Sequence, residues 1–468
     1  MYSFNNNLSL MQLIESWSTV DNPFNSTDEI LAWIDNKNRE VKVEINKIPF
    51  DYDGIDWHYD SQKGEIRNKA GSFFQIKGLQ KSINGEVVLE QPIIIQNEIG
   101  YLGIICKEFD GILYFLMQAK IEPGNINKIQ ISPTIQATKS NFMQAHGGKV
   151  PAYLDYFSNK NNYEIIVDQI QSEQSSRFLG KRNRNIIIVV DDDIPILDSH
   201  KWMTLGQIKQ LMSFDNLVNM DTRTVISCIP FALRDFSYKE LTHIRALFKN
   251  DFFYNSMFFG NSGYEINRIY QYMNEVKMLD VSEINLVDLK SLKSWKSING
   301  EFVSDNGSFK IVYCDIEIDG REVKKWQQPL LEATGTSTFG LIYCIDDNII
   351  KYLVHTKSEV GCFDKIEIGP SVQLDPIDDP SQSLVDSFFV EKLTNGSGVE
   401  FSGLFSEEGG RFYQEQNRNV IMRIEKCDLP KDLPDGYFWA DYQTLNILIQ
   451  FNNCLNIQLR NLLSILNL

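Results

Sequence analysis

Paired cysteines, clustered histidines and familiar catalytic motifs are what this sequence lacks. Its seven cysteines are scattered and form no CxxC pair, which favours free thiols in a reducing cytoplasm over disulfides. Its five histidines are dispersed, so they do not indicate a metal centre. No GxGxxG after a strand, no Walker loop, no HExxH and no GxSxG occurs.

Long apolar runs and excess positive charge are also missing. Residues 1–19 show no basic region followed by an apolar run, so we expect no signal peptide. No window approaches about 18 uninterrupted apolar residues, so we expect no membrane-spanning segment. The net charge of −17 argues against a general nucleic-acid binder, although a local basic pocket for a small anion is compatible with it.

What the sequence does contain is a long internal repeat. Segments 91–136 and 328–373 align without a gap at an offset of 237 residues, and segment 172–185 is similar to segment 406–419. A chain of 468 residues is too long for one ordinary core. We therefore predict two homologous domains, residues 1–234 and residues 235–468.

Each repeat has a mixed pattern of strands and helices. The expected strands of the first repeat are 71–78, 87–96, 101–109, 112–120 and 186–190. Asp110-Gly111 predicts a hairpin, and residues 204–212 and 221–228 predict helices, with Asp221 as an N-cap. Helical elements are expected at 8–36 and 238–274. Strands followed by helices predict an α/β fold of the mixed α+β kind.

One predicted strand carries a candidate acid–base pair. At a period of two, Gln118, Lys120 and Glu122 share one face. A lysine and a carboxylate in this arrangement can act together in a pocket. On a solvated face they would form only a weak ion pair, which is the commoner case for such a pattern alone.

A row of uncharged polar residues follows the turn that contains Asn125 and Asn127. At the same period, one face carries Ser132, Thr134, Gln136, Thr138 and Ser140. A plain solvent face usually carries Lys and Glu instead. Neutral donors and acceptors suit the hydroxyl groups of a sugar.

Residues 177–185 contain four cations and no acid, namely Arg177, Lys181, Arg182 and Arg184. Guanidinium groups suit the oxygens of a diphosphate. Pairing with Glu173 or other acids of the same domain is the alternative. The polar row nearby, and the recurrence of Arg177 and Arg184 in the second repeat, favour a binding site for one or two of these arginines.

Four stretches closely resemble the NDP-hexose 2,3-dehydratases, and the resemblance covers nearly the whole chain. They are EIGYLGIICKEFDGILYFLMQAKIEPGNINKIQISPTIQATKSNF, QSEQSSRFLGKRNRN, WMTLGQ and FDNLVNMDTRTVISCIPF. The resemblance implies two tandem Nudix-like domains from a gene duplication, a homodimer, and a nucleotide-sugar pocket in each repeat. It also implies that dTDP-4-keto-6-deoxyglucose loses its C2 hydroxyl as water without a metal or redox cofactor.

The resemblance and the residue patterns together give a set of candidate site residues. The expected catalytic base is Glu122, then Glu173, then Lys120. The expected substrate contacts are Gln118, Asn125, Asn127, Gln136, Thr138, Ser140, Arg177, Arg182, Arg184, Asn219 and Arg223.

Two alternatives stay open, a Nudix-type hydrolase and a non-catalytic nucleotide-sugar binding protein. The hydrolase requires a helix with clustered glutamates to hold metal ions, and no such run occurs. The second repeat has His355 in place of Gln118, Asp375 in place of Thr138, and Glu415 in place of Lys181. We therefore expect the first repeat to be active and the second to be degenerate.

Overall fold

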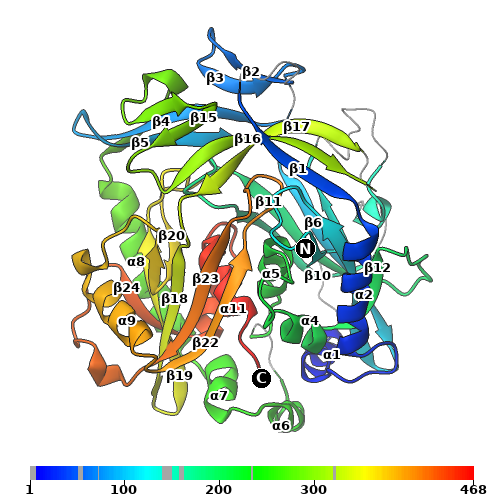
Figure 1. The fold of residues 1–468 in the computed structure, drawn as a ribbon. Helices are drawn as coiled ribbons and strands as arrows, with labels where there is room; N and C mark the ends of the chain where they lie inside the picture. The colour runs from blue at the N-terminus through cyan, green and yellow to red at the C-terminus, as the bar shows by residue number, and fades with distance from the viewer. Residues whose placement is uncertain are drawn as a thin grey trace.

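The computed structural model describes residues 7–50, 56–71, 73–139, 150–157, 163–232, 236–319 and 323–468. Ser140, one of the predicted substrate contacts, lies outside these ranges. Within them the architecture is mixed α and β, as predicted, with four sheets (Figure 1).

A seven-stranded sheet forms the centre of each repeat. The first contains β6 (Gly100–Phe109), β7 (Ile112–Ile121), β8 (Ile129–Ser132), β9 (Ile135–Ala137), β10 (Glu164–Ser172), β11 (Arg182–Val189) and β12 (His200–Thr204). The second contains β18 (Thr338–Asp346), β19 (Ile349–Lys357), β20 (Glu367–Pro370), β21 (Val372–Leu374), β22 (Val399–Ser406), β23 (Gln416–Arg423) and β24 (Tyr437–Asp441). Both sheets pair in the same order, and in both a parallel pair, β6 with β11 or β18 with β23, joins the two halves.

Two five-stranded sheets lie across the top of the view in Figure 1. One contains β2 (Trp57–Asp60), β3 (Glu65–Asn68), β4 (Gln75–Ile83), β5 (Glu86–Ile95) and β13 (Ser282–Val287). The other contains β1 (Val43–Ile48), β14 (Trp295–Ile298), β15 (Glu301–Ser304), β16 (Phe309–Ile318) and β17 (Lys325–Ala333). Strands are exchanged here, because β1 pairs with β16 and β13 pairs with β4. Each repeat therefore contributes one strand to the sheet of the other.

Helices cover the sheets and meet between the repeats. They are α1 (Asn7–Ser18), α2 (Thr27–Glu40), α4 (Leu205–Leu211), α5 (Met220–Ser227), α6 (Tyr238–Leu247), α7 (Asp251–Phe258), α8 (Ser262–Leu279), α9 (Leu384–Thr394), α10 (Tyr442–Leu448) and α11 (Ile457–Ser464). Short 3-10 turns occur at Leu154–Phe157, Leu289–Ser291, Pro380–Gln382 and Lys426–Asp428. Arg460 on α11 donates from Nε to Thr224 on α5 at 2.7 Å. The largest apolar core contains residues of both repeats.

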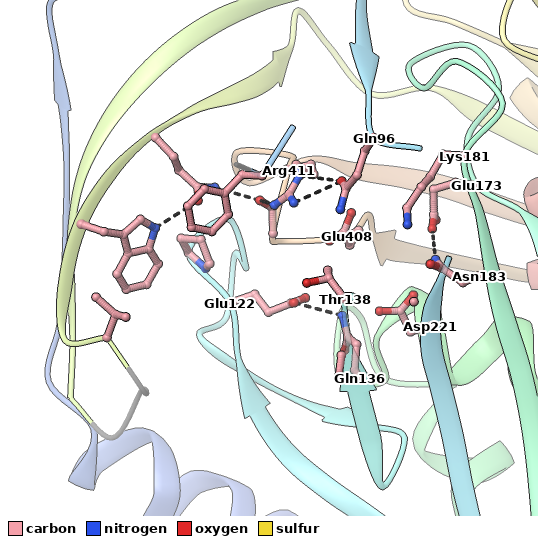
Figure 2. A pocket seen from close by; sticks show the side chains of 18 of the residues that line it. Gln96, Glu122, Gln136, Thr138, Glu173, Lys181, Asn183, Asp221, Glu408 and Arg411 are labelled. Atoms are coloured by element: carbon pink, nitrogen blue, oxygen red, sulfur yellow. Dashed lines mark hydrogen bonds between the residues drawn. The ribbon is translucent and has the colours of Figure 1, made fainter. Parts of the chain in front are cut away.

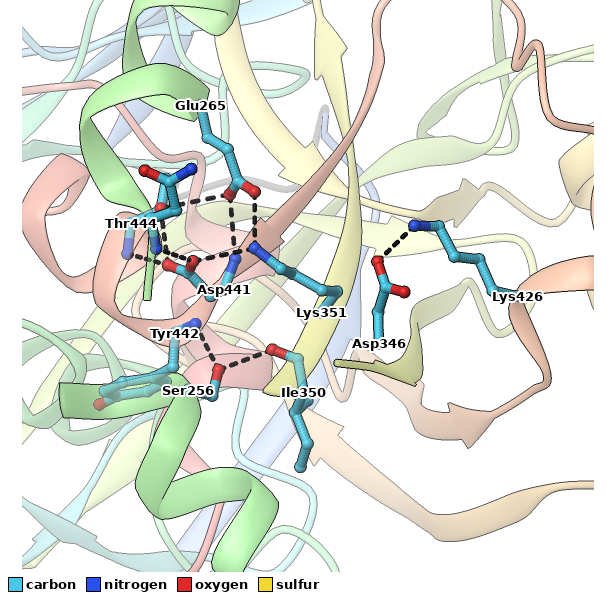
Figure 3. A network of polar contacts seen from close by, with 10 residues as sticks. Ser256, Glu265, Asp346, Ile350, Lys351, Lys426, Asp441, Tyr442 and Thr444 are labelled. Atoms are coloured by element: carbon cyan, nitrogen blue, oxygen red, sulfur yellow. Dashed lines mark hydrogen bonds and ion pairs between the residues drawn. The ribbon is translucent and has the colours of Figure 1, made fainter. Parts of the chain in front are cut away.

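An ionic network attaches α8 to the seven-stranded sheet of the second repeat (Figure 3). The Lys351 ammonium donates to Glu265 at 2.6 Å and to Asp441 at 3.0 Å. Asp441 also caps α10 by accepting from the Thr444 amide at 2.8 Å. These charges are mostly buried and satisfy one another, so we assign them to the scaffold.

Most expected elements are present, with two corrections. Asp110 and Gly111 both have positive φ, as a tight hairpin requires. Asn219, and not Asp221, caps α5 by accepting from the Thr222 amide at 2.8 Å, because it stands at the residue before the first helical one. The predicted polar row is interrupted between β8 and β9, where Thr134 turns its hydroxyl to the Ile105 amide at 2.9 Å.

Candidate active site

A cavity of about 360 Å³ opens at one end of the first seven-stranded sheet. Residues from both repeats line it. From the first repeat come Asp56, Trp57, Asn68, Phe73, Gln96, Gly100, Tyr101, Leu102, Lys120, Glu122, Pro123, Gln136, Ala137, Thr138, Glu173, Lys181, Asn183 and Asp221. From the second come Val323, Lys325, Trp326, Gln327, Gln328, Glu408, Gly410 and Arg411. Figure 2 shows carboxyl groups reaching into it from several sides.

Glu122 follows the end of β7 and is held by two neighbours. Lys120 Nζ lies 3.2 Å from Glu122 Oε1, and Gln136 Nε2 donates to the same oxygen at 3.0 Å. Asn219 in turn donates to Gln136 Oε1 at 3.2 Å, which fixes the orientation of that amide. The ion pair and the donated hydrogen bond hold the Glu122 carboxyl group at the cavity wall, where it can accept a proton from a bound ligand.

Glu173 is buried on the other side of the cavity. Its Oε2 accepts from Asn183 Nδ2 at 2.5 Å, while its Oε1 has no hydrogen-bond partner among the described residues. Burial and the nearby Glu408 raise the pKa of Glu173 to about 8. At neutral pH Glu173 is therefore mainly a neutral acid, able to donate a proton.

Asp221 is a site residue that the sequence analysis placed only as a helix cap. Its side chain lies on the first turn of α5, lines the cavity and is 2% exposed. Burial and the charges of Glu173, Glu122 and Glu408 raise its pKa well above the ordinary value. A difference between the repeats could have identified Asp221 as a site residue, because Gln458 stands at the equivalent position of the second repeat.

The second repeat contributes Glu408 and Arg411 to this cavity. Arg411 donates to Gln96 Oε1 at 3.1 Å and lies over the ring of Phe74 at 4.2 Å. Burial raises the pKa of Glu408 to about 7, against the opposing charge of Arg411. Sequence analysis missed both residues, because it treated each repeat as a separate pocket.

The structure brings five of the predicted residues together in the cavity: Lys120, Glu122, Gln136, Thr138 and Glu173. The other described ones do not line it, namely Gln118, Asn125, Asn127, Arg177, Arg182, Arg184, Asn219 and Arg223. Asn125 instead bonds the Lys128 carbonyl at 2.8 Å, and Asn127 bonds the Asn216 carbonyl at 2.7 Å. Asn219 reaches the site indirectly, through Gln136.

The four predicted arginines are engaged with other parts of the protein. Arg177 donates to Ser308 at 3.0 Å and lies 3.6 Å from Asp375. Arg182 stacks on Phe363 at 3.6 Å. Arg184 pairs with Asp168 at 2.6 Å. Arg223 is 1% exposed and donates to the Ser406 carbonyl at 2.8 Å, which ties α5 to β22.

The second repeat keeps the same framework but different charges. Glu359 accepts from Gln373 at 2.8 Å, as Glu122 does from Gln136. Glu407 accepts from Asn417 at 2.5 Å, as Glu173 does from Asn183. Glu407 also accepts from Gln174. Gln174 and Glu408 are equivalent positions of the two repeats, so Glu407 faces an amide where Glu173 faces a carboxyl group.

At the position of Thr138 the second repeat has Asp375, which lies beside Arg177. Charged groups around the second framework thus pair with one another. In the first repeat Glu173 and Glu408 instead face a cavity.

A carboxyl group paired with a lysine and facing neutral acids across a cavity is suited to removing a proton from one carbon, while an acid protonates a leaving group on the next. In the described ranges, no group of three or more His, Cys, Asp or Glu side chains is arranged to hold a metal ion. None of the helices in that part of the chain has the length and apolar composition needed to cross a membrane.

Comparison with known proteins finds relatives that match both repeats of the chain. A family model described as NDP-hexose 2,3-dehydratase matches residues 27–229 and again residues 266–466. A dTDP-4-dehydro-6-deoxy-alpha-D-glucopyranose 2,3-dehydratase of Saccharopolyspora spinosa is 36% identical over 462 residues, covering 97% of this chain and 94% of the relative. A relative of the same name from Amycolatopsis orientalis is 33% identical, covering 97% of this chain and 92% of its own.

Proposed function

The chain belongs to the NDP-hexose 2,3-dehydratase family, and we propose that it removes the C2 hydroxyl of dTDP-4-keto-6-deoxyglucose as water. The protein is then a carbon–oxygen lyase whose product is a 3,4-diketo-2,6-dideoxy sugar nucleotide. One observation carries the proposal: Glu122, paired with Lys120, and the neutral acid Glu173 line the same cavity.

The first step is removal of the C3 proton. The C4 ketone acidifies this proton, because the electrons left on C3 are delocalised onto the C4 oxygen. Glu122 is the base, and Lys120 and Gln136 hold its carboxylate in place from 3.2 Å and 3.0 Å. The product of this step is an enolate, whose negative charge must be stabilised.

The second step is loss of the hydroxyl from C2. The enolate reforms the C4 ketone, a C2–C3 double bond forms, and the C2–O bond breaks. Glu173 gives its proton to the departing oxygen, which leaves as water. The resulting C3 enol takes up a proton at C2 and loses the proton of its hydroxyl group, so it becomes the 3,4-diketone and the sequence is redox-neutral.

Substrate binding draws on both repeats in this proposal. Gln136 and Thr138 contact the sugar, as predicted from the polar row. Arg411 of the second repeat contacts the diphosphate, because among the described residues it is the arginine that lines the cavity. Arg177 has the equivalent position and faces Asp375, so any ligand contact of Arg177 belongs to the second repeat's own site.

The first repeat is the active one in this proposal, and the enzyme acts as a homodimer in the cytoplasm. All seven cysteines are free thiols, which supports a reducing compartment. The family resemblance supports the homodimer, which light scattering coupled to size-exclusion chromatography would test.

The proposed function is tested by incubating the protein with dTDP-4-keto-6-deoxyglucose and following the mass of the sugar nucleotide. The expected result is loss of one water with the diphosphate intact. Release of a nucleoside monophosphate that depends on added Mg²⁺ would support the hydrolase instead. Tight binding without any conversion would support the binding protein.

A further inference from the structure

Asp221 has no role in the two steps above, although its position is that of a residue in contact with substrate. It is 2% exposed and lines the cavity. In the view of Figure 2, Glu122 and Asp221 lie on opposite sides of Thr138 and Gln136. The Asp221 carboxyl forms no hydrogen bond or ion pair with another described residue, so a bound ligand is the partner available to it.

The surroundings of Asp221 favour its neutral form. Burial is the main cause, and the nearby carboxyl groups of Glu173, Glu122 and Glu408 further disfavour a negative charge on Asp221, whereas Lys120 acts in the opposite direction. A buried carboxylate without a partner costs several kcal/mol, and a group in that situation takes up a proton instead. A neutral carboxylic acid can donate a hydrogen bond, which a carboxylate cannot do.

The proposed reaction has one requirement that Glu122 and Glu173 leave unmet. When the C3 proton is removed, negative charge develops on the C4 oxygen, and a preorganised donor there lowers the barrier. A carboxylic acid kept neutral by its site is a known solution to this problem in other enzymes.

We propose that Asp221 is this donor: its protonated carboxyl donates a hydrogen bond to the C4 oxygen of the enolate. The proton stays on Asp221 throughout, so no net transfer occurs and the balance of the reaction is unchanged. The proposal rests on the dehydratase function, and it assigns to Asp221 a catalytic role separate from those of the base and the acid.

The test compares Asp221→Asn with Asp221→Leu, which have similar volumes but differ in their ability to donate. Two rates are measured with dTDP-4-keto-6-deoxyglucose in D₂O, exchange of the C3 hydrogen and loss of water. Asp221→Leu should slow both by about 10²-fold or more, the usual effect of losing an oxyanion donor. Asp221→Asn keeps an N–H donor and should remain within about tenfold of wild type.

Two further variants separate this role from the others. Glu173→Gln should lose water release but retain C3 exchange, because the acid acts after the enolate has formed. Gln458→Leu changes the equivalent position of α11 and should leave both rates within about twofold. Melting temperature and calorimetric binding of dTDP establish that each variant is folded.

Several results would overturn the inference. One is wild-type C3 exchange in Asp221→Leu, and another is equally severe loss in both Asp221 variants. If Asp221→Leu does not fold, a fall of about 10²-fold or more in both rates of Asp221→Asn is sufficient to reject the inference. A wild-type protein that releases no water would reject the proposed function together with this inference, whereas normal turnover in wild type and in Asp221→Leu would reject the inference alone.

Discussion

Gly124 of the first repeat donates its amide hydrogen to the carbonyl of Gly409 in the second, at an N–O distance of 2.7 Å. The relationship is reciprocal, since Gly361 donates to the Ser175 carbonyl of the first repeat at 2.7 Å. Each turn after β7 or β19 thus packs against the arginine-bearing loop of the other repeat. This contact brings Arg411 and Glu408 to the cavity of the first repeat.

We predict that Gly124→Ala separates these loops. A Cβ at this position would lie 1.6 Å from the Phe412 carbonyl oxygen, a distance that requires the backbone to move. The free energy of unfolding should fall by about 2 kcal/mol or more, the scale of overpacked core sites, as measured by chemical denaturation. Gly263→Ala is the control, because nothing lies within 4 Å of its Cβ. Equal stability of the two variants would contradict the packing argument.

Glu122→Gln should reduce kcat by about 10²-fold or more, because it removes the proposed base. Glu359→Gln makes the same change at the equivalent position of the second repeat, where Gln373 holds the carboxylate in the same way. Its kcat should remain within a few-fold of wild type. Steady-state kinetics of both variants decide the assignment, and a dead Glu359→Gln beside an active Glu122→Gln would invert the roles of the repeats.

Arg411→Ala should raise KM by about tenfold with a smaller change in kcat, because a diphosphate contact is equally strong in the ground state and the transition state. Arg177→Ala removes the equivalent arginine, which faces Asp375 and Ser308 instead. It should lower the melting temperature and leave KM within about twofold. If Arg177→Ala raises KM and Arg411→Ala does not, the diphosphate binds near Arg177 and Asp375 instead.

The period of two along β7 predicted that Lys120 and Glu122 share one face, and their side chains do meet at 3.2 Å, since strand geometry is local. The contribution of Arg411 and Glu408 could not be predicted in this way. The repeat aligns Arg411 with Arg177, but no local pattern tells which repeat's cavity each one faces. That depends on the packing of Gly124 against Gly409, which joins residues far apart in the chain.

Asp221 shows a different limit. Helix rules correctly predicted a start near this residue, and Asn219 took the cap that those rules assigned to Asp221. Its burial depends on the way α5 packs under the cavity, which sequence patterns do not describe. Only a comparison of the repeats could point to Asp221 as a site residue, since Gln458 replaces this acid in the second repeat while the neighbouring Asn219 recurs as Asn456.

Turnover should fall as the pH rises above about 8. The proposed acid Glu173 has its pKa raised to about 8, chiefly by burial, so it holds its proton below that value and loses it above. The fall in kcat at alkaline pH should therefore disappear in Glu173→Gln. The residual rate of this variant should be lower and should not depend on ionisation of residue 173. An alkaline limb that persists unchanged in the variant would assign the ionisation to another group.

Glu367 on β20 provides a stability test that is independent of catalysis. It is 1% exposed, and neither carboxylate oxygen has a hydrogen-bond partner among the described residues. Burial raises its pKa to about 8, with Arg460 acting in the opposite direction. The equivalent residue of the first repeat is Gln130, so this position of the framework accepts a neutral amide.

The sign of the effect follows from proton binding. Between about pH 4.5 and 8 the folded protein keeps the proton on Glu367 while the unfolded chain releases it, so stability falls as the pH rises, by up to about 1.4 kcal/mol per pH unit from this group. Glu367→Gln removes this dependence. Relative to wild type, the variant should therefore gain free energy of unfolding from pH 5 to pH 8 in urea titrations. Glu391→Gln makes the same substitution at an exposed site on α9 and should show no such gain. A constant difference between Glu367→Gln and wild type across this range would mean that Glu367 is ionised in the folded protein and stabilised by Arg460.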